Sequence, residues 1–190
     1  MDTLNKNDLL SDFEKYSKLI ESGAIFIYPT DTVYGVGCDA RNETGVMKIK
    51  QMKQRYKPLS VIAPSKKWVE DNFVILEKHK HWLDKLPGKY TLVLEAKNDV
   101  LPITVSGGKK IGIRIPNHWI SGFVERLGFP VITTSVNIAG IEPLTNAEQL
   151  GETNYDTFKD ADFFVDEGRI NGSRSAVVDL TGEREFYLRM

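Results

Sequence analysis

Hydroxyl, amide and cationic side chains follow several apolar runs in this chain. The stretch "YPTDTVYGVG" (28–37) begins at the end of one apolar run, and "TTSVN" (133–137) comes directly after another. Arg114 lies within the isoleucine-rich stretch "KIGIRIP". Side chains of these types bind ligands that carry negative charge and hydroxyl groups. The pattern therefore indicates a site for a small anionic ligand.

Four more residues fit the same chemistry: Lys53, Arg55, Ser175 and Arg189. Each motif also has a purely structural interpretation. Threonines suit strands, cations at a helix end favour its dipole, and "TTSVN" can form a hydrogen-bonded turn. Asp31 either orients the site or forms an Asx turn. Only the combination of the motifs favours a binding site.

Arg114 gives the sharpest indication. It alternates with Ile113 and Ile115, so its guanidinium points to the opposite face of the strand and needs an anionic partner if that face is covered. Lys53 and Arg55 diverge by about 200° on a regular helix, so they reach one phosphate only if the helix ends there. The following Tyr-Lys-Pro favours such an ending.

Several other functions find no support in the sequence. There is no phosphate-binding P-loop, dinucleotide fingerprint, C-x-x-C pair or G-x-S-x-G nucleophile motif. On a helix, His79 and His81 would not share a face, and Cys38 has no partner for a disulfide. The net charge of −1, the absence of a signal-like N-terminus and the absence of a long apolar run predict a cytoplasmic protein with no membrane contact.

Helical and strand patterns are mixed along the whole length, which predicts one layered α/β domain. The late strands lack helices between them, so we expect antiparallel pairs and a mixed sheet. In the helix expected at 43–54, Val46, Ile49 and Met52 face inward and the lysines face outward. Other helices are expected at 8–22, 65–72, 76–85, 117–127 and, weakly, 146–160, and strands at 24–29, 58–64, 90–96, 110–116, 130–135, 163–168, 175–180 and 185–189.

The motifs resemble one known family. In order, "YPTDTVYGVG", "KQR" with "KPLSV", "PGKYTLVL", "IGIRIPNH", "PVITTSVNIAG" and "SAVVDL" are similar to the YrdC family, the threonylcarbamoyl-AMP synthases. The resemblance runs from about Gly23 to Arg189 and implies the short, single-domain form. It implies an α+β fold over 1–190: one catalytic domain with a strongly twisted mixed sheet, flanked by helices in three layers, and a concave groove.

The resemblance also implies a reaction. L-threonine, bicarbonate or CO2, and ATP with Mg²⁺ would give threonylcarbamoyl-AMP and pyrophosphate. The product would pass to a separate transferase that modifies tRNA, and the protein itself could contact tRNA. No protein nucleophile or protein-bound metal is required.

Roles for individual residues follow from the same resemblance. Thr32, Arg114, Thr133 and Ser175 would bind threonine. Lys53, Arg55, Ser135, Asn137 and Arg189 would bind the nucleotide, with Lys53 and Arg55 as the catalytic pair. The chain departs from the family pattern in a shortened loop after Arg55, in Ile62 where some members have histidine, and in Ala139 where serine is common.

Three alternatives remain open at this point. A related enzyme could make carbamoyl-AMP from carbamoyl phosphate, and a regulatory sensor of ATP or an amino acid could use the same fold. An RNA-binding module could use the basic segment from Lys48 to Lys57, although the overall charge and the lack of a base-stacking motif argue against strong RNA binding.

Overall fold

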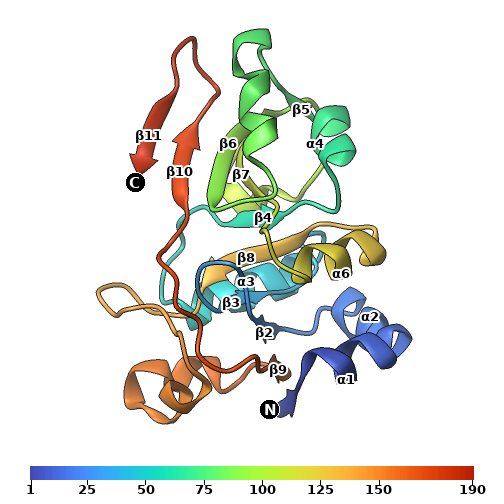
Figure 1. Cartoon of the computed structure of the whole chain (residues 1–190), viewed down its shortest axis with the longest axis vertical. Coiled ribbons are helices and arrows are strands. Elements are labelled where there is room, and N and C mark those ends of the chain that lie inside the picture. Colours follow the sequence, from blue (N-terminus) through green and yellow to red (C-terminus); the bar gives the residue numbers. More distant parts are fainter.

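The computed structural model describes all 190 residues and shows helices on both sides of a β-sheet (Figure 1). Its strands are β1 (Asp2–Leu4), β2 (Phe26–Tyr28), β3 (Gly35–Gly37), β4 (Ser60–Ile62), β5 (Phe73–Val74), β6 (Tyr90–Ala96), β7 (Lys110–Arg114), β8 (Val131–Ser135), β9 (Phe163–Val165), β10 (Ala176–Asp179) and β11 (Phe186–Arg189). Its helices are α1 (Lys6–Ser11), α2 (Phe13–Glu21), α3 (Glu43–Met52), α4 (Lys66–Asn72), α5 (Ile103–Ser106) and α6 (Ile120–Leu127), with 3₁₀ helices η1 (Glu77–Lys85), η2 (Ala147–Gly151) and η3 (Thr153–Phe158).

All eleven strands belong to one mixed sheet in the order β1-β9-β2-β3-β8-β4-β7-β6-β10-β11, with β5 pairing β6. The strand direction turns strongly between β8 and the β6–β10–β11 end, so the sheet is twisted (Figure 1). This arrangement confirms the expected α+β class. No helix is long and apolar enough to cross a membrane.

Several expectations about the elements are wrong. The helix expected at 8–22 is interrupted at Asp12. The segments expected to be helical at 76–85 and 146–160 are helical, but as 3₁₀ helices. β10 and β11 are antiparallel as expected, but β9 pairs in parallel with both β1 and β2. Lys50 in α3 does not face outward: it is buried, with 6% of its surface exposed.

The motif at 28–37 contains a strand that the sequence pattern did not predict. β3 pairs with β2 and β8, and an added Cβ at Gly37 would lie 2.1 Å from the Ile132 carbonyl oxygen and 3.0 Å from the Tyr28 ring. Only glycine fits this close approach of two strands. The second glycine therefore serves the sheet, while the turn before it remains free to build a site.

The two faces of the sheet are covered differently. One face packs under α3, α4, α5 and the 3₁₀ helices in a large apolar cluster that includes Ile111, Ile113 and Cys38. The other face packs under α1, α2 and α6 over only part of its area, in a smaller cluster that includes Tyr28 and Ile62. The rest of that second face lacks a helical cover.

The uncovered part of the sheet carries small and polar residues. Ser60 pairs with Gly112 on one side and with Thr133 on the other, so these three residues share a face. A Cβ at Gly112 would come within 2.4 Å of Ser60 Oγ and 3.1 Å of the Thr91 methyl carbon. Because no bulky side chain projects from this surface, it can form the floor of a cavity.

A strap of chain (166–175) runs from β9 to β10 along the side of the molecule (Figure 1). The Tyr34 hydroxyl donates to the Gly168 carbonyl at 2.7 Å and accepts from the backbone N–H of Glu167 at 3.0 Å. An added Cβ at Gly172 would lie 2.0 Å from the Thr32 carbonyl oxygen. The strap is thus fastened to the polar motif and closes one side of the uncovered face.

The last strand of the sheet has an irregular edge. β11 pairs with β10, but the register shifts between Val177 and Val178, as in a β-bulge. Phe186 and Leu188 are 67% and 56% exposed on this strand.

We expect Phe123→Ala to lower the free energy of unfolding by about 3–5 kcal/mol, because this α6 side chain is buried where the helices cover the sheet. Urea denaturation followed by circular dichroism measures the change. The control Ile103→Ala, at a site 70% exposed, should shift the free energy of unfolding by less than about 0.5 kcal/mol. Equal stabilities of the two variants would contradict this packing.

Candidate functional site

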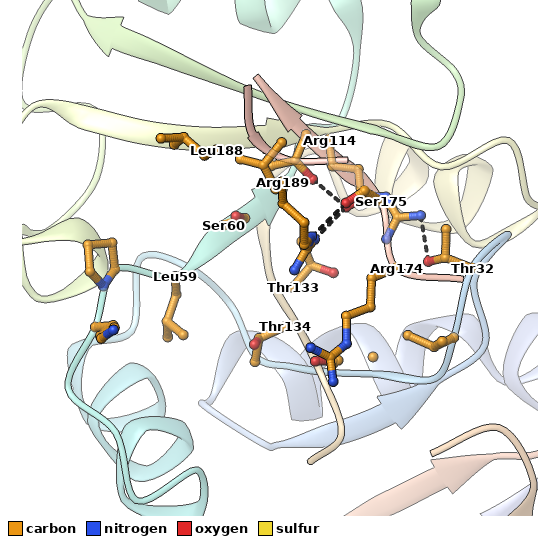
Figure 2. Close-up of a pocket in the computed structure, with 18 of the residues that line it drawn as sticks. Thr32, Leu59, Ser60, Arg114, Thr133, Thr134, Arg174, Ser175, Leu188 and Arg189 are labelled. Carbon is orange, nitrogen blue, oxygen red and sulfur yellow. Dashed lines mark hydrogen bonds between the residues drawn. The ribbon is translucent and has the colours of Figure 1, made fainter. Parts of the chain in front are cut away.

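A cavity of about 600 Å³ lies over the uncovered part of the sheet (Figure 2). Every residue that the sequence predicts for the site lines it: Thr32, Lys53, Arg55, Arg114, Thr133, Ser135, Asn137, Ser175 and Arg189. These residues come from strands, turns and loops that are far apart in the chain. The structure therefore brings all of them to one place, while the role of each stays a prediction.

The turn after β2 is fixed by its own hydroxyl groups. Thr30 Oγ1 accepts hydrogen bonds from the backbone N–H groups of Thr32 at 3.1 Å and Val33 at 3.3 Å. The hydroxyls of Thr30 and Thr32 are 2.9 Å apart, and both residues are buried. Such a turn holds Thr32 at the cavity in one orientation. The sequence interpretation included Thr30 in this motif but gave it no role of its own, whereas the structure shows that it organises the turn.

Arg114 is buried beside this turn, and Asp31 is the anionic partner that its burial requires. Arg114 Nη2 forms an ion pair with Asp31 Oδ1 and donates to Thr32 Oγ1 at 2.8 Å. Burial lowers the pKa of Arg114, and the charge of Asp31 opposes that shift. Arg114 Nε is buried without a hydrogen-bond partner. Nη1 also has no recorded partner and is not fully buried, so the cavity wall carries a fixed cation whose Nη1 donors remain unused.

Asp31 does not form the Asx turn considered from the sequence. Its Oδ1 takes the Arg114 guanidinium, and its Oδ2 accepts from the backbone N–H of Asn117 at 2.9 Å. The carboxylate thus joins the turn after β2 to the segment between β7 and α6. Sequence spacing gives no signal for this contact, because the partners are more than eighty positions away from Asp31.

Ser175 is held by two side chains from neighbouring strands. Its hydroxyl lies 2.8 Å from Thr91 Oγ1 and accepts from Arg189 Nη2 at 3.1 Å, while Arg189 Nε donates to the Ser175 carbonyl at 2.8 Å (Figure 2). Burial lowers the pKa of Arg189, and the nearby cations Arg174 and Arg114 add to this shift. Arg189 therefore ties β11 to the wall of the cavity.

The helix α3 ends just before Lys53 and Arg55, as the sequence interpretation required for both to reach one site. The helix ends at Met52, and Gln54 adopts a left-handed conformation with φ of 50°. Lys53 is buried, whereas Arg55 is exposed at the cavity. The chain reversal lets both side chains belong to one site although they would point apart on a continuous helix.

The Lys53 ammonium holds the turn that follows β8. Its Nζ donates to the carbonyl oxygens of Ser135 at 2.5 Å and Asn137 at 2.9 Å. Asn137 Nδ2 in turn donates to the Ile141 carbonyl at 2.7 Å. Desolvation by burial lowers the pKa of Lys53 to about 7, with smaller contributions from Arg55 and Arg174. Lys53 therefore combines a structural role with a titratable charge at neutral pH.

The cavity is strongly cationic although the whole chain is not. Besides the predicted residues, Lys57, Lys110 and Arg174 line it, and the one lining carboxylate is Asp179. Figure 2 shows Arg114, Arg174 and Arg189 around the same space. The sequence interpretation included Arg174 in the polar motif at 173–175 but gave it no role of its own. A cluster of this kind attracts anions with several charges, such as polyphosphates.

Comparison with known proteins shows which proteins are similar to this chain. The family model for Sua5, YciO and YrdC proteins, described as "Telomere recombination", matches residues 18–190. A relative from Methanocaldococcus jannaschii is 32% identical over 98% of this chain and 88% of its own length. The protein named threonylcarbamoyl-AMP synthase from Idiomarina loihiensis is 32% identical over 82% of this chain and 85% of its own length.

Solved structures show the same fold. P. abyssi Sua5, solved in complex with L-threonine, has a TM-score of 0.84 at 28% identity over 99% of this chain. The present chain spans 56% of that longer chain. E. coli YciO also has a TM-score of 0.84, at 19% identity over 99% of this chain and 92% of its own. Motifs, fold and comparisons agree, and the chain belongs to the Sua5/YciO/YrdC family.

Proposed function

We propose that this protein makes threonylcarbamoyl-AMP from L-threonine, bicarbonate or CO2, and ATP, with release of pyrophosphate. One observation carries the proposal: a single cavity is lined both by the Thr32–Arg114 pair and by the cations and polar turn that include Arg55 and Asn137. The relatives named threonylcarbamoyl-AMP synthase and the threonine complex of P. abyssi Sua5 support it.

The threonine carboxylate is proposed to bind at Arg114. The Nη1 group of Arg114 has no recorded partner and, unlike Nε, is not fully buried, so a carboxylate in the cavity can accept hydrogen bonds from it. Thr32, Thr133 and Ser175 line the cavity with polar groups that can bind the amino acid. These contacts would place the threonine amine inside the cavity, toward the cationic end.

The triphosphate is proposed to bind at the cationic end. Arg55, Lys57 and Arg174 are exposed there and are available to phosphate oxygens. Lys53 adds charge from its buried position in the cavity wall and holds the turn that contains Ser135 and Asn137, the proposed nucleotide contacts. Arg189 contacts Ser175 and its charge interacts with that of Arg174, so we propose that it reaches the nucleotide from the threonine side.

The proposed chemistry needs no nucleophile from the protein. The threonine nitrogen bonds to the carbon of CO2 and loses a proton, which gives a carbamate. A carbamate oxygen then bonds to the α-phosphorus of ATP, the bond from that phosphorus to the bridging oxygen breaks, and pyrophosphate leaves with the electron pair. The residues of the cavity align the reactants and offset the charge on the phosphates.

Mg²⁺ is proposed to enter with ATP. Asp179 is the only carboxylate that lines the cavity, and it already accepts hydrogen bonds from Thr181 at 2.7 and 2.9 Å. The lining residues therefore do not form a carboxylate cage for a resident ion. Mg²⁺ commonly keeps several waters and binds through substrate phosphates, where it would offset their charge.

The product is proposed to pass to a tRNA threonylcarbamoyl transferase. A direct tRNA contact and the cytoplasmic location expected from the sequence stay predictions.

The reaction is tested by incubating the purified protein with Mg²⁺, ATP, bicarbonate and each amino acid in turn. We expect mass spectrometry to detect an adenylate with L-threonine, and pyrophosphate release to depend on it. An adenylate formed only from carbamoyl phosphate would favour a carbamoyl-AMP enzyme. Salt-dependent RNA binding by a protein that does not consume ATP would favour an RNA-binding module.

Arg55→Ala should lower threonine-dependent pyrophosphate release by about 100-fold or more, because it removes a cation from the proposed triphosphate site. The exposed position of Arg55 predicts an unchanged fold by circular dichroism. Lys48→Ala is the matched control, since this exposed cation lies outside the cavity. Turnover near that of the wild type in Arg55→Ala would remove this residue from the proposed role.

Triphosphate binding should take up a proton at about pH 8. In the free protein the pKa of Lys53 is about 7, so its amine is mostly neutral at that pH. Burial, the main cause of this low pKa, persists, but bound phosphates would favour the protonated amine directly and would offset Arg55 and Arg174, so the pKa should rise. Proton uptake therefore begins above about pH 7, and affinity falls as pH rises through this window.

Calorimetry of ATP binding in two buffers with different ionisation enthalpies measures this uptake. Lys53→Met should abolish it, whereas Lys48→Met should retain it. Equal heats of ATP binding in the two buffers for the wild type would show that binding is not coupled to protonation of Lys53.

A further inference from the structure

Asp31 lies behind the threonine end of the cavity and is not one of its lining residues. Its side chain is only 7% exposed, yet both carboxylate oxygens are occupied, one by Arg114 and the other by Asn117. We propose that Asp31 is a positioning residue that orients the Arg114 guanidinium for the carboxylate of the amino-acid substrate. This inference rests on the proposed function and assigns a specific task within that site.

The hydrogen bonds define which part of the guanidinium remains available. Arg114 Nη2 carries two N–H groups, and its recorded partners are Asp31 Oδ1 and Thr32 Oγ1. Nε is fully buried without a partner, so a ligand in the cavity cannot reach it, whereas Nη1 has no recorded partner and is not fully buried. Asp31 thus binds the Nη2 end of the guanidinium and leaves the two N–H groups of Nη1 for the substrate. Without Asp31, the Arg114 side chain could rotate, and this orientation of the guanidinium would be only one of several.

The position of Asp31 is itself fixed from two sides. The backbone N–H of Asn117 holds Oδ2, and the Thr30 hydroxyl organises the turn that carries Asp31 and Thr32. Asn117 comes shortly after β7, the strand that carries Arg114. The carboxylate therefore locks the relative position of the two segments that present Thr32 and Arg114 to the cavity.

The charge of Asp31 also prepares the subsite before the ligand arrives. A buried guanidinium without an anion is costly and would turn toward any available acceptor. With Asp31 in place, the charge of Arg114 is offset and the group is already oriented. Substrate binding then loses less conformational entropy, which is the general advantage of preorganisation.

The test compares Michaelis constants for threonine and for ATP. Asp31→Asn keeps the shape of the side chain but removes its charge. We expect the KM for threonine to rise about 10- to 100-fold and the KM for ATP to stay within about twofold. A residue that only stabilises the fold would lower the amount of active enzyme and would leave both constants unchanged.

Asp39→Asn is the matched control. Asp39 is also a buried carboxylate, and it accepts from Arg41 Nε at 3.0 Å and Nη2 at 2.7 Å, but it lies outside the cavity. This variant should lose stability while keeping both Michaelis constants. Asp31→Glu is the second test variant, because it keeps an anionic partner for Arg114, and hence the folded protein, but displaces the guanidinium. The KM of this variant for threonine should also rise about 10-fold.

The outcomes separate the two proposals. An active wild type whose Asp31 variants keep the KM for threonine, or lower it, overturns the positioning role alone. A wild type that forms no threonine-dependent adenylate overturns the proposed function. In that event threonine calorimetry decides the role of Asp31: about 10-fold weaker binding in Asp31→Asn than in Asp39→Asn supports it, and equal binding or no binding to the wild type overturns it.

Discussion

The burial of a guanidinium in the middle of a sheet is the constraint on which the site depends. Arg114 stands on a strand whose neighbouring residues are apolar, so its charge needs a fixed partner inside the protein. Asp31 is that partner, and it comes from a turn more than eighty residues earlier in the chain. The same contact brings Thr32 to the cavity. One electrostatic requirement thus places two of the residues that define the threonine end.

A second constraint is that a single sheet face serves both as core and as binding surface. Where α1, α2 and α6 cover it, the face carries large apolar residues such as Tyr28 and Ile62. Beyond these helices the same face carries Ser60 on β4, Gly112 on β7 and Thr133 on β8. The change of side-chain size along each strand decides where the helices stop and where the cavity begins.

Local patterns in the sequence predict a layered domain with a mixed sheet and a set of polar motifs, while the α+β fold and the members of the site followed from the resemblance of these motifs to one family. Strands that alternate in polarity could be recognised, and the motif residues lie together as expected. The partners of Asp31 and Lys53 could not be predicted, since both contacts join segments distant in the chain. The parallel pairing of β9 was missed for the same reason: no nearby residue specifies which strand it joins.

The register shift in the pair β10–β11 has a consequence for solubility. An exposed outer strand with large apolar side chains is a template on which another chain can add and start aggregation. Phe186 and Leu188 would make β11 such a template. The local kink of a bulge twists the strand and interrupts its regular ladder of backbone groups, so a flat neighbouring strand cannot align along it. This irregularity protects the chain from adding copies of itself at that edge.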